Sequence, residues 1–376
     1  MKICVVAGDA VGGLRKHVHD TLFALDSDIK AVYVHSCVSD AAAIRDFAGL
    51  DRFLLGRFAF PIKKNPAVSD LKIIWAIFKE CRRLQVDLIH GHGAKGGLYA
   101  RIVGLLLWIP VVVTPHGGSV HARFGLLKQK MFGSVEFLLK FITTLFIFES
   151  VYTKTAFIKM AGAIPSSKSL VNFNGIKVSE FVPSGSWRAP LGTPIRLLTI
   201  GNLNKVKGQS VVLEALAILM KNNRNVLLEM CGSGEDAEYL AQLAHTLGVS
   251  SLVEFHGDVS DVRAYFKNAN VVVIPSYFES FGYVGVEAGL MARPVVASAT
   301  GGLKEVVLDG ETGVLFAPGD AAGLAGAVEL LIDQPEWGDH LVANARIRCV
   351  EQFDLARMTA SVFSAYRKIL GCDTPG

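Results

Sequence analysis

Short apolar runs alternate with longer amphipathic stretches along most of the chain. The runs are rich in β-branched residues and the stretches have the length of helices, so the alternation predicts parallel β-α-β units. Strands are predicted at Lys2–Ala7, Ala31–His35, Leu88–His90, Val111–Thr114, Arg196–Ile200, Val226–Cys231, Leu252–His256, Val271–Pro275 and Val295–Ser298. Helices are predicted at Leu14–Leu25, Asp70–Leu84, Gly97–Leu107, Lys128–Leu145, Gly208–Lys221, Glu235–Thr246, Val284–Met291 and Ala321–Ile332. Because the predicted strands are almost wholly apolar, helices are expected on both faces of each sheet.

A segment rich in proline, glycine and serine, PSGSWRAPLGTP, interrupts the pattern before it starts again. The chain of 376 residues is also too long for one ordinary domain. The sequence therefore predicts an α/β fold of two doubly wound, Rossmann-like domains, with an N-terminal domain over residues 1–183, a linker over 184–194 and a C-terminal domain over 195–353. Ligands of such sheets bind beyond the carboxyl ends of the strands, so we expect the site there, in a cleft between the two domains.

Composition narrows the class of protein. Apolar residues make up 51% of the chain and charged residues 19%, which excludes a disordered chain. The six cysteines lie far apart without metal-binding spacing, which favours a reduced, cytoplasmic protein. The N-terminal residues lack the pattern of a signal peptide. The most apolar segments, Val103–Thr114 and Phe141–Phe148, are shorter than the roughly 20 residues of a bilayer span, so no transmembrane helix is expected.

The net charge of +4 hides an asymmetry between the halves. Residues up to Pro190 include 24 Lys and Arg against 13 Asp and Glu, whereas the remainder includes 14 against 21. A basic half suits an anionic partner such as a membrane surface, a diphosphate-linked acceptor or nucleic acid, although a solvated surface of mixed charge is an equally simple interpretation. The region Lys128–Phe148 mixes lysines with the apolar run Phe137–Phe148, which is typical either of a membrane-surface helix or of a core helix.

Residues suited to phosphate and sugar chemistry follow several predicted strands of the first half. Gly12 and Gly13 precede a helix, where glycines and free N–H groups allow a phosphate to approach; a tight turn is the simpler alternative. His116 follows a strand in TPHGG and could hydrogen-bond a substrate. His90 and His92 could lie near the same edge, but a metal site would need partners that are not close in sequence, so no metal site is predicted.

The second half contains the strongest pattern. Lys207 follows the first strand of this half and could neutralise a diphosphate, with Asn202 and Lys205 as weaker candidates. In the segment ESFGYVGVE, two acids stand eight positions apart, Glu279 in a loop and Glu287 in a helix. Carboxylates accept hydrogen bonds from paired sugar hydroxyls, and the helix N-terminus between them offers amides to a phosphate.

Two other patterns resemble sites of a different kind. Gly232, Gly234 and Ala237 fit a dinucleotide-binding fingerprint, with Glu254 about 20 residues further on, but the pattern lies in a middle strand rather than in a first β-α unit. Asp26 and Asp28 fit the D-x-D pattern of a metal site, but acids are common in turns of this kind.

The segment ESFGYVGVE resembles the E-x7-E signature of the retaining GT-B glycosyltransferases of family 4. The resemblance extends over almost the whole chain, through TPHGG, FNGI, GNLNKVKG, FHGDVSD, GGLKEVV and GETGVLF. It implies the GT-B fold, with a C-terminal helix over about 354–376 that returns to the N-terminal domain. It also implies a hexosyltransferase-type enzyme (EC 2.4) that uses a nucleotide sugar, without a metal or another cofactor, and retains the anomeric configuration.

The resemblance also implies roles for single residues. Glu287 matches the acid that binds the ribose, Glu279 the acid that binds the donor sugar, and Lys207 the lysine on the diphosphate. His116 matches a histidine near the donor sugar, and it is expected to act in catalysis with Lys207 and Glu279. The expected donor-binding positions, apart from Glu287, are Gly12, Gly13, Asn202, Phe281, Gly282, Tyr283 and Val284. Members of the family often have arginine at the position of Asn202, so one phosphate-binding cation is missing from this chain.

The expected partners are a UDP- or GDP-sugar and a lipid-linked or glycan-precursor acceptor, with peripheral attachment to the inner face of an anionic membrane and without nucleic acid. An epimerase or a phosphorylase is an alternative, because similar folds host both activities. An inactive membrane-associated scaffold of the same fold is a second alternative. A nicotinamide dehydrogenase is disfavoured, because the first β-α turn lacks the G-x-G-x-x-G pattern.

Overall fold

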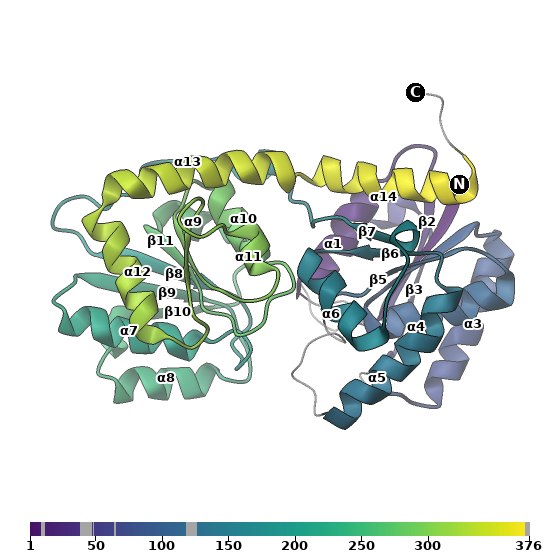
Figure 1. Cartoon of the computed structure of the whole chain (residues 1–376), viewed down its shortest axis with the longest axis horizontal. Coiled ribbons are helices and arrows are strands. Elements are labelled where there is room, and N and C mark those ends of the chain that lie inside the picture. The colour runs from purple at the N-terminus through teal and green to yellow at the C-terminus, as the bar shows by residue number, and fades with distance from the viewer. Residues whose placement is uncertain (9–11, 38–46, 48, 64, 118–125, 373–376) are drawn as a thin grey trace. The chain divides into compact units, whose positions relative to one another are not determined.

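The computed structural model describes residues 1–8, 12–37, 47, 49–63, 65–117 and 126–372, with backbone only for 126–129. The chain divides into two compact units (Figure 1). Unit 1 comprises Met1–Gly175 and Leu355–Gly376, and unit 2 comprises Ile176–Asp354. Each unit is built around its own parallel sheet, as the alternating pattern predicts.

Unit 1 contains, among its described residues, a seven-stranded sheet with the order β3-β2-β1-β4-β5-β6-β7. Its strands are β1 (Lys2–Ala7), β2 (Lys30–Ser36), β3 (Leu54–Phe60), β4 (Leu88–His92), β5 (Val111–Thr114), β6 (Leu145–Phe148) and β7 (Ser169–Val171). Its helices are α1 (Gly12–Phe23), α3 (Ser69–Leu84), α4 (Gly93–Leu107), α5 (Leu126–Leu139), α6 (Val151–Ala161) and α14 (Leu355–Leu370). The strand order reverses direction between β1 and β4, which is where doubly wound sheets bind ligands.

Two helix layers cover the unit 1 sheet. Helices α3 and α4 pack together on one face, and α1 and α14 pack together on the other (Figure 1). The α14 residues Val362, Phe363 and Tyr366 are buried against strand residues of β1 and β2. The guanidinium of Arg367 binds Asp26 and Asp28 at 2.6 and 2.7 Å. The D-x-D pattern of the sequence thus anchors the C-terminal helix.

Unit 2 contains, among its described residues, a six-stranded parallel sheet with the order β10-β9-β8-β11-β12-β13. Its strands are β8 (Ile195–Ile200), β9 (Val226–Cys231), β10 (Val253–Gly257), β11 (Val271–Ile274), β12 (Val295–Ser298) and β13 (Val314–Phe316). Its helices are α7 (Gln209–Lys221), α8 (Ala237–Thr246), α9 (Arg263–Asn268), α10 (Tyr283–Leu290), α11 (Leu303–Val306), α12 (Ala321–Asp333) and α13 (Pro335–Gln352). Helix α7 packs against α8 and α12, and α10 packs against α13 (Figure 1).

The segment predicted as a linker belongs to unit 2 and is fixed to it. Trp187 is buried, and its indole Nε1 donates to a carboxylate oxygen of Asp339 at 2.8 Å. The Trp187 ring packs so closely on Gly338 that a Cβ there would lie 2.5 Å from it. The carbonyl of Ser184 accepts a hydrogen bond from the buried Arg293. Proline and glycine content predicts a chain break, but the buried Trp187 and the hydrogen bond from Arg293 to Ser184 attach the segment to the core of unit 2. The unit boundary lies at 175/176 instead of 183.

The sequence prediction missed three strands of unit 1, namely β3, β6 and β7. The predicted helix Lys128–Leu145 ends as α5 at Leu139, a single 3₁₀ turn follows, and the rest of the apolar run forms the buried strand β6. Because Leu145–Phe148 is a buried strand, the run Phe137–Phe148 is neither one core helix nor one membrane-surface helix. A short apolar run of this length fits a buried strand and a buried helix equally well. Within the described ranges, every helix is too short or too polar to cross a bilayer.

Candidate functional site

Two loops meet at the point of unit 2 where the strand order reverses. They leave the carboxyl ends of the neighbouring strands β8 and β11. Lys207 comes from the first loop and Glu279 from the second, and the lysine Nζ lies 2.8 Å from a carboxylate oxygen of Glu279. Both side chains are partly exposed, at 30% and 16%, so a ligand can reach them. The chain thus places a cation and an acid where doubly wound sheets bind their ligands.

The conformation of the Lys207 loop follows from its sequence. The Asn204 side-chain oxygen accepts hydrogen bonds from the N–H groups of Val206 and Lys207, which closes a tight turn. Gly208 follows with a φ of +66°, and a Cβ at this position would lie 2.3 Å from the Pro275 carbonyl oxygen. Only glycine allows the two loops to approach this closely.

The Glu279 loop is fixed by its contact with the loop that follows β12. Gly302 donates its N–H to the carbonyl of Glu279 at 2.9 Å, and a Cβ on Gly302 would lie 2.0 Å from the Ser280 carbonyl oxygen. Gly282 has a φ of +113° and begins α10. The Phe281 side chain is buried against Tyr283 and Phe353, so only its backbone is available to a ligand.

Glu287 lies in α10, one turn after Tyr283 and Val284 of its N-terminus, and is 8% exposed. Asn202 is exposed in the loop after β8, and its carbonyl accepts a hydrogen bond from the Gln209 side chain. A cavity of about 570 Å³ opens at the start of α7. It is lined by Asn204, Lys205, Gly208, Gln209, Ser210, Asp236, Tyr239, Leu240 and Tyr277.

The glycine pattern at Gly232 and Gly234 has a structural explanation within the same loop cluster. A Cβ on Gly232 would lie 2.0 Å from the Gly201 carbonyl oxygen, and a Cβ on Gly234 would lie 2.2 Å from the Leu203 carbonyl oxygen. The loops after β8 and β9 therefore pack backbone against backbone, which excludes side chains at both glycines.

In unit 1, Gly12 and Gly13 are exposed at the start of α1, and Gly12 has a φ of +54°. No atom lies within 4 Å of a Cβ built on Gly12, counting the described part of the chain, so the need for glycine there is conformational. The preceding residues 9–11 of the glycine-rich loop lie outside the described ranges.

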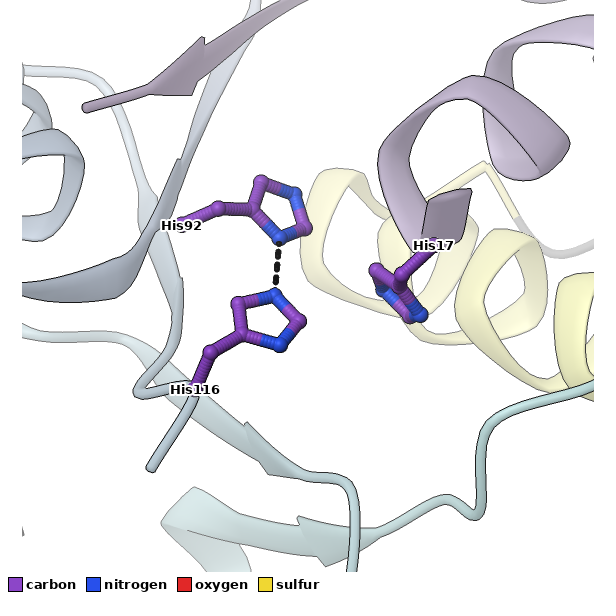
Figure 2. A group of neighbouring side chains, drawn as sticks. All are labelled: His17, His92 and His116. Carbon is purple, nitrogen blue, oxygen red and sulfur yellow. Dashed lines mark hydrogen bonds between the residues drawn. The ribbon is translucent and has the colours of Figure 1, made fainter. Parts of the chain in front are cut away.

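His116 lies inside a largely buried chain of hydrogen bonds that links His92, His116, Glu149 and Asn174. Its Nε2 lies 3.0 Å from Nδ1 of His92, which is at the end of β4 (Figure 2). Its Nδ1 lies 3.1 Å from a carboxylate oxygen of Glu149, the first residue after β6. Asn174 donates to the same oxygen at 2.8 Å. Burial alone would raise the pKa of Glu149, but the adjacent His116 ring and these hydrogen bonds lower the pKa to about 2. Glu149 is thus an anion, and Nδ1 of His116 donates to it.

Two further histidines surround this chain. His17 from α1 faces His92 and His116 (Figure 2). Burial lowers the pKa of His17 to about 3, and the neighbouring His116 adds to the effect. His90 bonds to the Tyr366 hydroxyl at 2.6 Å and to Thr114 at 2.9 Å. Burial also lowers the pKa values of His90 and His92, so His17, His90 and His92 are neutral at pH 7.

Sequence reasoning missed His17 and Glu149 as members of this cluster. Glu149 follows β6, and an acid directly after a buried strand is the signal that would have identified it once that strand had been recognised. His17 lies in α1, four residues after Gly13. No motif around it in the sequence marks it as a site residue.

Two family profiles match the chain. Residues 187–348 match the glycosyl transferases group 1, and residues 11–180 match glycosyltransferase family 4. The chain belongs to glycosyltransferase family 4, group 1.

The GT-B fold predicted from the sequence is confirmed by solved structures. Anabaena HepE in complex with UDP-glucose superposes with a TM-score of 0.82, at 22% identity, over 98% of this chain and all of that one. The sucrose-phosphate synthase of Thermosynechococcus elongatus has a TM-score of 0.78 at 21% identity, over 99% of this chain and 100% of that one.

Curated members of the family match more strongly in sequence but over shorter stretches. A glycogen synthase of Mycobacterium tuberculosis is 35% identical over 186 residues, which is 48% of this chain and 45% of that protein. A D-inositol 3-phosphate glycosyltransferase of Corynebacterium diphtheriae is 29% identical over 285 residues, 68% of this chain and 65% of that protein. The chain thus spans about half to two thirds of the length of the relatives it matches.

Proposed function

We propose that this family 4 protein transfers a sugar from a nucleotide-sugar donor to an acceptor hydroxyl, with retention of configuration. The observation that carries the proposal is the Lys207–Glu279 pair at the strand-order reversal of unit 2, at the positions of the family's lysine and first acid. Glu287, on the helix that follows the loop, is the ribose-binding acid of this proposal.

Each group of the site has a task that fits its chemistry. Lys207 donates to Glu279 in the free protein, and in the donor complex the ammonium would stabilise the negative charge of the leaving diphosphate. Glu279, released from the lysine, would accept hydrogen bonds from hydroxyls of the donor sugar and orient it. The amides of Gly282, Tyr283 and Val284, at the N-terminus of α10, would bind a phosphate. This set of charges provides the electrostatic role that a metal ion has in other transferases.

Nucleotide binding tests the proposal first. HepE was crystallised with UDP and with UDP-glucose, which favours a UDP-sugar as the donor of this protein too. We expect UDP to raise the melting temperature more than GDP, ADP or NAD at equal concentration. A ligand at 100 times its Kd stabilises by about 2.7 kcal/mol. Differential scanning fluorimetry measures the shift, and Glu287→Ala is expected to abolish it because the ribose hydroxyls lose their acceptor.

The matched control is Glu214→Ala, which removes an exposed acid from α7 of the same unit and should leave the UDP shift unchanged. Stabilisation by NAD alone would overturn the proposal. Equal stabilisation of wild type and Glu287→Ala by UDP would refute the role given to Glu287.

For the acceptor, we propose a lipid-linked or glycan-precursor hydroxyl reached by peripheral attachment to the cytoplasmic face of an anionic membrane. Exposed apolar side chains gather on α5 and the turn after it. They are Met131, Val135, Phe137, Leu138 and Phe141. Lys140 lies over the rings of Phe137 and Phe141, with its Nζ 4.3 and 5.6 Å from their centroids. Apolar side chains interleaved with lysines are typical of surfaces that enter the interface of an anionic bilayer. The side chain of Lys128 lies outside the described residues.

Flotation with liposomes tests this attachment. We expect the protein to float with vesicles containing anionic lipid at low salt and to be released at high salt, since the lysines attract the surface electrostatically. The double variant Leu138→Asp/Phe141→Asp should remain in the unbound fraction. Leu191→Asp, at a fully exposed leucine of unit 2, is the matched control. Absence of wild-type flotation at low salt would exclude the membrane proposal without affecting the donor site.

A further inference from the structure

Three histidines of unit 1 converge although they come from distant parts of the sequence. His17 lies on α1, His92 at the end of β4 and His116 in the loop after β5 (Figure 2). Among the described residues, they form the one group whose ring nitrogens, one from each residue, all lie within 4.8 Å of one another. We propose that this cluster is a binding site for a divalent transition-metal ion of the zinc class, with the three imidazoles as ligands.

The ligand set fits such an ion. Three histidines with a fourth position left open form a known arrangement for zinc, with Zn–N distances of about 2.0–2.1 Å. Two nitrogens on a tetrahedral ion of this size lie about 3.4 Å apart. Nδ1 of His92 and Nε2 of His116 are 3.0 Å apart, so a small opening of this pair would admit the ion.

An unsatisfied ring nitrogen also fits the proposal. Nδ1 of His17 is buried and has no hydrogen-bond partner among the described residues, so a polar atom inside the cluster remains unsatisfied. Satisfying buried polar atoms is favourable, and an ion at the centre of the cluster would do so for this ring.

Glu149 and Asn174 do not bind the ion themselves but hold the ligand His116 in place. Glu149 accepts the Nδ1–H of His116, which fixes the tautomer with the Nε2 lone pair directed toward His92. A carboxylate that holds a ligating histidine in this way is a regular feature of zinc sites. When the ion binds, the hydrogen bond between His92 and His116 is lost, and His92 moves its proton from Nδ1 to Nε2 and remains neutral. His90 is not part of the ligand set, because Tyr366 and Thr114 occupy both of its nitrogens.

Occupancy of the cluster has a consequence that rests on the proposed function. The ion would occupy Nε2 of His116, a residue that the family resemblance implies acts in catalysis, so zinc would inhibit transfer. Binding and inhibition are separate measurements. Loss of the proposed transferase function would leave the binding result intact.

Cobalt substitution tests the binding directly. Tag-free protein stripped with chelator is titrated with Co²⁺ and then with Zn²⁺. We expect one equivalent of cobalt to give the visible absorption of a four- or five-coordinate ion, and zinc to abolish this absorption by displacement. His17→Gln and His92→Gln should lose the absorption. Glu149→Gln should retain it with an affinity about 10–100-fold weaker, as for other groups that orient a ligand.

Two controls separate the site from other histidines. His340→Gln removes an exposed histidine of unit 2, and His90→Gln removes the buried neighbour whose nitrogens are occupied. Both should keep the full absorption, and circular dichroism checks that each variant is folded. A titration of wild type without a visible band would overturn the proposal. It would be overturned equally by a band that persists in folded His17→Gln and His92→Gln.

Discussion

Replacement of Lys207 by methionine is expected to lower kcat about 100- to 1000-fold, the loss seen when one group that stabilises a developing anion is removed. Lys207 provides a positive charge in the loop after β8, and methionine keeps most of the length of its side chain without the charge. Because the diphosphate gains charge as the sugar leaves, the loss should fall mainly on kcat rather than on KM. Steady-state release of the nucleoside diphosphate, with wild type and variant at saturating donor, measures the effect.

Lys221→Met is the matched control, because Lys221 ends the same helix, α7, that begins after Lys207. It should retain wild-type kcat. Glu279→Gln should also lose activity, since an amide accepts fewer hydrogen bonds from sugar hydroxyls than a carboxylate does. Normal kcat in both Lys207→Met and Glu279→Gln would show that the pair does not carry catalysis.

The unit 2 site could be predicted from the sequence because its residues lie in short, continuous segments. Lys207 and Glu279 each follow a clear β-branched strand, and the carboxyl ends of neighbouring parallel strands meet at one edge. The 2.8 Å contact between the two side chains is a detail that the sequence does not contain. The glycines that force the loops together, Gly208 and Gly302, can be understood only from the backbone atoms that a Cβ would meet.

The histidine cluster of unit 1 could be predicted only in part. His92 and His116 can be predicted from the sequence because each stands at or just after a strand end, and the sheet brings the two strands side by side. Their partners His17 and Glu149 cannot be predicted in this way. His17 approaches them only because α1 packs on the sheet, and Glu149 can be recognised as a strand-end residue only once β6 is known. The apolar run before Glu149 continues from the end of α5, and its periodicity does not separate helix from strand. The sequence predicts no metal site at His90, His92 and His116, because no carboxylate or cysteine stands close to them in sequence.

Unit 1 also contains a buried charged side chain, Arg101, which the pattern of apolar residues does not predict. Arg101 lies in the middle of α4, and its side chain is fully buried. Its guanidinium makes two hydrogen bonds to the Glu136 carboxylate of α5, at 3.2 and 2.8 Å, and one to Thr143 at 2.9 Å. Helix α4 begins directly after His92, so this pair fixes the helix that continues from one member of the cluster.

Arg101→Met is therefore expected to lower the free energy of unfolding of unit 1 by about 3–5 kcal/mol, the range for breaking a buried ion pair by removing one partner. The loss comes mainly from the Glu136 carboxylate, which remains buried without its cation. Urea denaturation followed by circular dichroism measures the change. A total stability of about 5–15 kcal/mol is typical of a domain, so the variant would unfold at clearly lower urea concentration.

The double variant Arg101→Met/Glu136→Leu distinguishes the cost of an unpaired charge from the loss of packing. It should be more stable than Arg101→Met alone, because the isolated buried carboxylate is gone. Arg83→Met is the surface control, since Arg83 pairs with Glu80 on α3 with 62% of its side chain exposed, and such pairs contribute about 0–1 kcal/mol. Equal losses in Arg101→Met and the double variant would mean that the arginine acts by filling space. In that case the position of α4, and of His92 before it, would depend on the volume of the Arg101 side chain rather than on its charge.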